Sequence, residues 1–65
     1  MNGKIKFYNV AKGYGFIIDN ETQEEYFFHV TGLLYSNPQK EDEVTFELEE
    51  TAKGVKGINV TLAEN

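Results

Sequence analysis

The chain has 65 residues, a formal charge of −5 at pH 7 and no cysteine. A chain of this length is expected to form a single domain over residues 1–65, and the lack of cysteine excludes disulfides and thiolate metal sites. The sequence contains neither an apolar segment long enough to cross a bilayer nor an N-terminal signal segment, so we expect a cytoplasmic protein.

The first expected strand, residues 3–9, lies in a locally basic part of the chain. Lys4, Lys6 and Lys12 fall within the first twelve residues, which contain no acid, although the whole chain is acidic. This flank offers phosphate groups a cationic contact. The alternative is that these lysines merely keep a strand face solvated.

The orientation of Phe7 in this strand depends on its regularity. Simple alternation from Ile5 would point Phe7 toward the core. A twist or a β-bulge would instead turn Phe7 to the outer surface and leave Tyr8 more nearly under the sheet, and alternation alone does not decide between the two orientations.

The next two expected strands, residues 14–19 and 25–30, place rings on a shared face, because side chains alternate in direction along a strand. The rings on that face are those of Tyr14, Phe16, Phe27 and His29. Each could be a core residue, but Ile17, Tyr26 and Phe28 on the opposite face already fill an interior. Exposed rings beside lysines are what recognition of single-stranded nucleic acid requires.

The sequence after residue 30 predicts the remaining elements of a barrel. A single 3₁₀ turn is expected at residues 30–33, followed by a loop and two strands, residues 43–50 and 55–62, joined at Lys53-Gly54. In the first of these strands Val44, Phe46 and Leu48 alternate with polar residues and point inward. Five short strands without helical periodicity predict an all-β fold: a small five-stranded antiparallel barrel of the oligonucleotide-binding type.

Several segments resemble those of a known family. Lys12-Gly13-Tyr14-Gly15-Phe16-Ile17 resembles the first ribonucleoprotein motif of the bacterial cold shock proteins, and Tyr26-Phe27-Phe28-His29-Val30-Thr31 resembles the second. Gly3 to Asn9, Glu43-Val44-Thr45-Phe46 and Gly57-Ile58-Asn59-Val60 resemble the first, fourth and fifth strands of that family. The resemblance covers nearly the whole chain. It implies a single cold shock domain that binds single-stranded RNA and DNA and acts as an RNA chaperone or a regulator of translation or transcription.

The resemblance also implies a set of binding residues. The implied stacking surface consists of Phe7, Tyr14, Phe16, Phe27 and His29, so we expect a twist or a β-bulge that turns Phe7 outward. Lys6 and Lys12 are expected near phosphates, and Asn9 either bonds a base edge or braces the adjacent loop. Lys53 and Lys56 either touch phosphates or lie in a solvated turn. A single barrel of this type covers about five to seven nucleotides.

The chain departs from the family pattern at several places, three of which bear on binding. Phe7 stands where Trp is usual, and Val30 stands where many members have Phe, which removes a stacking contact worth about 1–3 kcal/mol. The loop from Gly32 to Asp42 is short, and its Tyr35 either replaces the aromatic residue that members present from this loop or covers the end of the barrel.

Other functions have less support in the sequence. His29 is the only histidine, so a histidine-based metal cluster is excluded, and no Ser or Cys stands beside it as a nucleophile. We therefore expect no catalytic residues, no metal and no cofactor, and Glu25 is expected to accept a hydrogen bond from a base. The alternative function is a small protein-interaction barrel that uses the same aromatic face. We expect a monomer, with a strand-swapped dimer as the alternative.

Overall fold

The computed structural model describes residues 1–63, so the last two residues of the expected domain, 64 and 65, lie outside the described residues. The elements are β1 (Asn2–Asn9), β2 (Tyr14–Asp19), β3 (Glu25–His29), the 3₁₀ turn η1 (Val30–Gly32), β4 (Glu43–Thr51) and β5 (Gly54–Leu62). Every strand begins and ends within one residue of the segment expected from the sequence, and the 3₁₀ turn is also confirmed.

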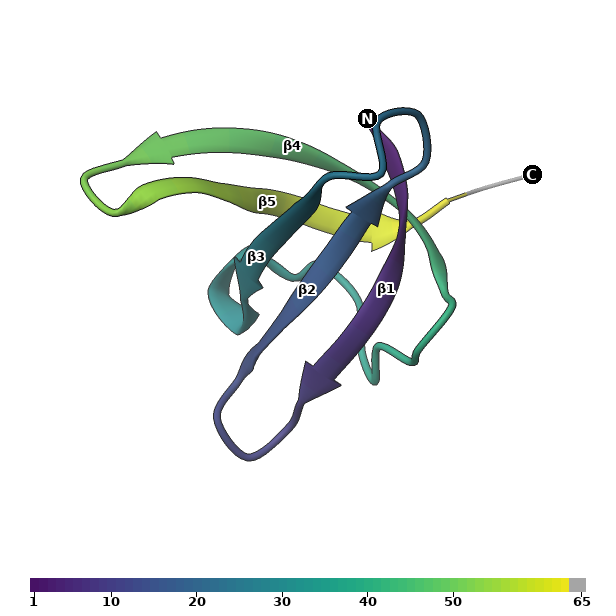
Figure 1. Cartoon of the computed structure of the whole chain (residues 1–65). Helices are drawn as coiled ribbons and strands as arrows, with labels where there is room; N and C mark the ends of the chain where they lie inside the picture. The colour runs from purple at the N-terminus through teal and green to yellow at the C-terminus, as the bar shows by residue number, and fades with distance from the viewer. Residues whose placement is uncertain (64–65) are drawn as a thin grey trace.

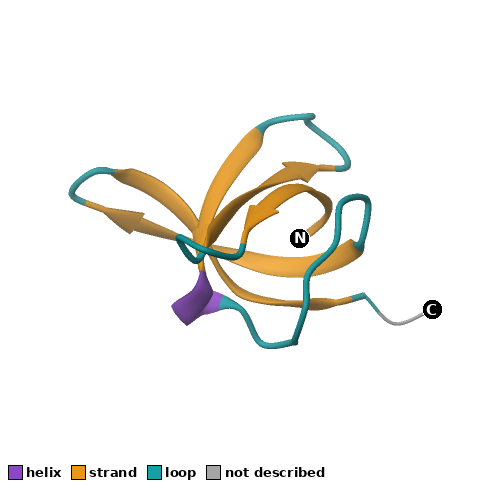
Figure 2. Cartoon of the chain, turned by 90° about the horizontal axis from the view of Figure 1, so that it is seen from below, coloured by secondary structure: helices purple, strands orange, loops and turns teal. Residues whose placement is uncertain are grey.

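The strands close into a barrel in the order β1-β2-β3-β5-β4 (Figure 1). β1 pairs with β2, β2 with β3, and β4 with β5, all antiparallel, and β1 also pairs with the start of β4. A short parallel pairing of Phe27 with Lys56 and of Phe28 with Gly57 completes the barrel. The five-stranded β-barrel is confirmed, and the parallel pair is a feature that strand periodicity does not indicate. The β4–β5 hairpin extends past the barrel, and η1 follows β3 directly (Figure 2).

The core contains the inward residues that alternation predicts. The buried apolar side chains are Ile5, Ile17, Phe28, Val44, Phe46 and Val60. Tyr8, Tyr26, Leu33, Tyr35 and Leu48 are partly buried and pack against this cluster. Because these residues fill the inside of the barrel, the outward rings of β2 and β3 are not needed there.

A β-bulge interrupts β1 and sets the direction of Phe7. The pairing with β2 shifts between Ile5, which faces Ile17, and Phe7, which faces Phe16. Lys6 is the extra residue, so Lys6 and Phe7 are both exposed although they are neighbours in the chain. The ring of Tyr8 stacks on that of Phe28 at a centroid distance of 5.8 Å. The expected bulge, the outward Phe7 and the inward Tyr8 are all confirmed.

Candidate nucleic-acid interface

Two rows of side chains cross the outer face of the sheet formed by β1, β2 and β3. The first row runs through Phe7, Phe16 and Phe27, and the second runs through Asn9, Tyr14 and His29. Residues that face each other on paired strands have Cβ atoms about 4.5–5.5 Å apart, so each row is a line of touching side chains. We call the five rings of these rows the platform: Phe7, Tyr14, Phe16, Phe27 and His29. The structure thus brings together the residues from which the sequence predicts a stacking surface.

The phenyl and phenol rings of the platform lie at stacking range from one another. The centroid of Phe7 lies 5.3 Å from that of Phe16 and 5.9 Å from that of Tyr14. The centroid of Phe27 lies 5.7 Å from that of Tyr14 and 6.0 Å from that of Phe16. These rings meet tilted or edge-on, which is the geometry that aromatic pairs prefer. Phe7 is 38% exposed and the other three are partly buried, so the rings support one another and still reach the surface.

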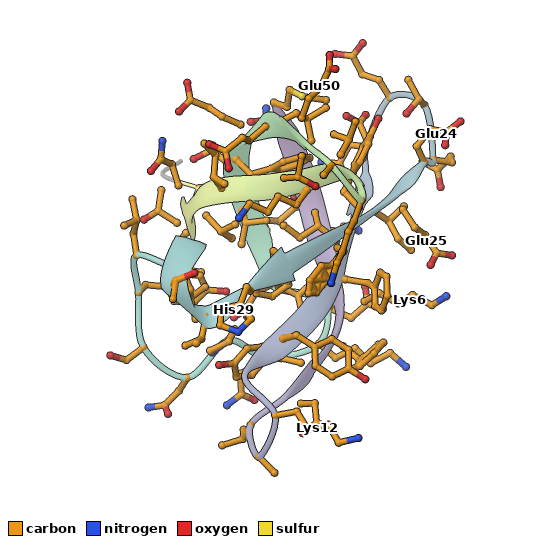
Figure 3. All side chains as sticks on the ribbon, turned by 90° about the vertical axis from the view of Figure 1, so that its left-hand side faces the viewer. Lys6, Lys12, Glu24, Glu25, His29 and Glu50 are labelled. Carbon is orange, nitrogen blue, oxygen red and sulfur yellow. The ribbon has the colours of Figure 1, made fainter. Side chains whose placement is uncertain are left out.

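His29 is fixed at the edge of the platform by the turn that follows it. Its Nδ1 accepts a hydrogen bond from the backbone N–H of Thr31 at 3.2 Å and lies 3.1 Å from Thr31 Oγ1. The side chain thereby caps η1, and Figure 3 shows His29 near the end of β3. This contact could not be predicted from the sequence, because histidine is not among the residues that commonly cap a helix with their side chains.

The cationic flank of the platform is partly neutralised by acids from other strands. Lys6 Nζ lies 2.9 Å from Glu25 Oε2, and both side chains are about half exposed, 47% and 48%. Figure 3 shows this pair and Lys12 on one side of the molecule. Lys12 has no acidic partner within 4 Å among residues 1–63. The first twelve residues contain no acid, but in the folded chain β3 places Glu25 beside Lys6 of β1.

Asn9 braces the turn between β1 and β2. Its Oδ1 accepts a hydrogen bond from the backbone N–H of Lys12 at 3.0 Å, and its carbonyl accepts one from Gly13 at 2.8 Å. Gly13 has a φ of 70°, a conformation that favours glycine. The Gly13 carbonyl in turn accepts a hydrogen bond from Val30 N–H at 2.8 Å. Of the two roles expected for Asn9, the structure displays the bracing of the loop that carries Lys12.

Tyr35 lies apart from the platform. Its ring packs against the core cluster, and its hydroxyl donates a hydrogen bond to Asp42 Oδ2 at 3.1 Å. Burial raises the pKa of Tyr35, and the hydrogen bond and negative charge of Asp42 raise it further. Of the two positions expected for Tyr35, the structure shows the one in which this residue covers the end of the barrel.

Lys53 and Lys56 lie beside Phe27 at the other edge of the sheet. Together with Val55 they line a groove of about 550 Å³. Lys56 Nζ lies 3.5 Å from Glu49 Oε1, whereas Lys53 has no acidic partner within 4 Å among the described residues. This edge therefore adds limited positive charge to the face that carries the platform.

The chemistry available on this face is stacking and charge contact. Within residues 1–63 there is no cluster of three or more His, Cys, Asp or Glu side chains that could hold a metal ion. In the same part of the chain, no helix is long and apolar enough to span a membrane.

Comparisons with known proteins give the same picture. The model of the "'Cold-shock' DNA-binding domain" family matches residues 1–63. Y-box-binding protein 1 of Xenopus laevis and Y-box-binding protein 3 of Homo sapiens are each 39% identical over 66 residues, covering 91% of this chain but only 22% and 18% of those proteins. The major cold shock protein of Micrococcus luteus is 36% identical over 62 residues, covering 91% of this chain and 92% of that protein. The chain thus spans about a fifth of the two Y-box-binding proteins and nearly all of the bacterial protein. The resemblance carried by the two ribonucleoprotein-like motifs is confirmed, and the chain belongs to the cold-shock domain family.

Proposed function

We propose that this cold-shock domain binds single-stranded RNA and DNA through the platform and acts as an RNA chaperone that keeps RNA unpaired and so modulates translation or transcription. It works as a single domain and a monomer in the cytoplasm, without catalysis and without a cofactor. The observation that most supports this proposal is the pair of rows on β1, β2 and β3, in which ring centroids lie 5.3–6.2 Å apart on an outer face.

Stacking supplies the affinity in this proposal. Each base that stacks on an aromatic side chain contributes about 1–3 kcal/mol. In a duplex the faces of the bases are already covered by neighbouring base pairs, so the platform can reach them only in an open strand. A protein that binds the open strand alone shifts the equilibrium away from hairpins by mass action.

Charge has a secondary role because few lysines are free. Lys12 stands on the braced turn beside Tyr14 and meets a phosphate without losing an acidic partner. Lys6 must exchange Glu25 for a phosphate, and an exposed ion pair of this kind is worth only about 0–1 kcal/mol, so the exchange is feasible. Tyr35 is left out of the proposed interface because it covers the barrel end.

The preference for open strands can be tested directly. A labelled heptanucleotide should bind at least about tenfold more tightly than the same nucleotides locked in a hairpin stem, since stacking contacts of about 1–3 kcal/mol per base are available only to the open strand. Fluorescence anisotropy gives both affinities, and a melting curve should show that the protein lowers the hairpin Tm. Equal binding to the stem would contradict the proposal, and so would a raised Tm.

Replacing Glu25 with Gln should strengthen binding of the heptanucleotide by up to about fivefold, because exposed charge pairs contribute up to about 1 kcal/mol. The change frees Lys6 and removes a negative charge beside the phosphates. Because the gain is electrostatic, it should shrink when the titration is repeated at high salt.

The matched control for this variant is Glu50→Gln. It changes the net charge by the same amount at an exposed position of β4 that has no lysine within 4 Å among the described residues. Figure 3 shows Glu50 at a distance from Lys6. An equal gain in both variants would mean that total charge, and not the release of Lys6, controls affinity.

A further inference from the structure

A groove lies on the outer face of β1 where the bulge interrupts the strand. It has a volume of about 480 Å³, which falls within the range of small-ligand sites. Its lining includes Lys4, Lys6, Phe7, Ile18, Gln23 and Lys40. We call it the bulge groove. The groove shares Phe7 and Lys6 with the interface described above. The two surfaces are therefore continuous, and a nucleic-acid strand that leaves the platform at Phe7 can pass directly into the groove.

The charges around the bulge groove suit an anionic ligand. Lys4 is paired with Glu43 at 3.8 Å, and Lys6 with Glu25 at 2.9 Å, both at half-exposed positions where a phosphate can replace the acid. Lys40 is exposed and has no acidic partner within 4 Å among residues 1–63. The lining contains three lysines and one acid, Glu41, while Glu43 and Glu25 lie against Lys4 and Lys6, so Lys40 is the lysine of the groove that can meet a phosphate without exchanging an ion-pair partner.

The bulge groove also offers a surface for a base. Phe7 and Ile18 supply apolar contact. The side-chain NH₂ of Gln23 donates to the Asn20 carbonyl at 3.2 Å, and that of Asn20 donates to Glu43 Oε2 at 3.2 Å. The amide oxygens of Asn20 and Gln23 therefore remain acceptors for the N–H groups of a base.

Backbone hydrogen bonds hold the walls of the groove in place. Ile5 N–H donates to the Asp42 carbonyl at 3.0 Å, and the Ile5 carbonyl accepts a hydrogen bond from Glu41 N–H at 2.8 Å. These bonds tie the loop that carries Lys40 to β1 at the bulge. Glu41 has a φ of 76°, an uncommon conformation for a residue other than glycine and one that is often found at binding sites.

We propose that the bulge groove binds one further nucleotide of a single strand that lies on the platform. Its phosphate lies among Lys4, Lys6 and Lys40, and its base lies against Ile18 and Phe7. This inference rests on the proposed function, since the strand must first occupy the platform.

The test compares Lys40→Ala with the wild-type chain on two oligothymidylates, one of six nucleotides and one of nine, by isothermal titration calorimetry. Lys40 lies outside the platform, so the hexanucleotide should bind both proteins equally. The nonanucleotide should bind Lys40→Ala about threefold to fivefold more weakly than the wild type, the size expected for one exposed charge contact. Loss of one phosphate contact should also make the log–log salt dependence shallower by about 0.7 for the nonanucleotide alone.

Lys53→Ala is the matched control, because it removes another exposed lysine that has no acidic partner among the described residues and lies beside Phe27, outside the lining of the bulge groove. This control should keep the full advantage of the nonanucleotide over the hexanucleotide. If Lys40→Ala also keeps that advantage, or weakens both oligonucleotides equally, the groove does not bind a nucleotide. Failure of the wild type to bind either oligonucleotide would instead overturn the proposed function itself.

Discussion

Replacing both Phe16 and Phe27 with alanine should weaken binding of a heptanucleotide by at least about 30-fold, because two stacking contacts of about 1–3 kcal/mol each are lost. These two rings face each other across β2 and β3, with centroids 6.0 Å apart, and they occupy the middle of the platform. Neither belongs to the buried core, so the barrel should still fold. Anisotropy titration measures the loss, and circular dichroism checks the fold.

A double variant elsewhere on the surface separates stacking from a general loss of apolar area. Leu34 and Leu62 are 62% and 48% exposed and lie outside the platform. Leu34→Ala/Leu62→Ala should bind the heptanucleotide as the wild type does. Undiminished binding by a folded Phe16→Ala/Phe27→Ala variant would place the nucleic acid on another surface, whereas no binding by the wild type would favour the alternative of a protein-interaction barrel.

Gly15→Ala should lower the free energy of unfolding by about 1–3 kcal/mol, the usual cost of overpacking. A Cβ at Gly15 would contact the Phe7 carbonyl oxygen and would lie 2.8 Å from a ring carbon of Phe28, which is fully buried. Neither the strand backbone nor the core ring can move aside easily. Urea denaturation measures the change, and because small domains have marginal stability a loss of this size should be easy to detect.

Gly57→Ala is the comparison for this substitution. Gly57 is also a buried glycine in a strand, but a Cβ there would meet its neighbours at 3.6 Å or more, which is ordinary van der Waals contact. The Gly57 variant should therefore be clearly more stable than the Gly15 variant. Equal stability of the two would show that loss of glycine as such, and not the crowding between Phe7 and Phe28, determines the cost.

The elements of this fold could be predicted from sequence because each strand carries a clear signal. The alternation of Val44, Phe46 and Leu48 fixes the inner face of β4, and the rings of β2 and β3 have inward neighbours that already account for a core. The parallel contact of Phe27 with Lys56 could not be predicted in the same way. This contact depends on which strands pair when the barrel closes. Alternation within one strand does not indicate which other strand it pairs with.

The sequence predicts which face of a strand each side chain of the candidate site points to. It does not predict which side chains of different strands come into contact. Tyr14, Phe16, Phe27 and His29 share a face by simple alternation. The ion pair of Lys6 with Glu25 joins residues 19 positions apart, so the lysine flank seemed free of acids in the sequence. Lys40 gave no signal at all, because only the backbone hydrogen bonds of Ile5 with Glu41 and Asp42 bring its loop beside β1.

The bulge in β1 makes the length of this strand a determinant of recognition. An ordinary strand shows every second residue to solvent, whereas β1 shows Lys6 and Phe7 consecutively and still returns Tyr8 to the interior. Deleting the extra residue, Lys6, would restore strict alternation with Phe7 still outward and Tyr8 still inward. A deletion or insertion elsewhere in β1 that leaves the bulge in place would instead exchange the inner and outer residues on one side of the change. A substitution at an exposed position such as Lys4 leaves the direction of the other β1 side chains unchanged, whereas an insertion or deletion away from the bulge would alter the binding surface and the core together.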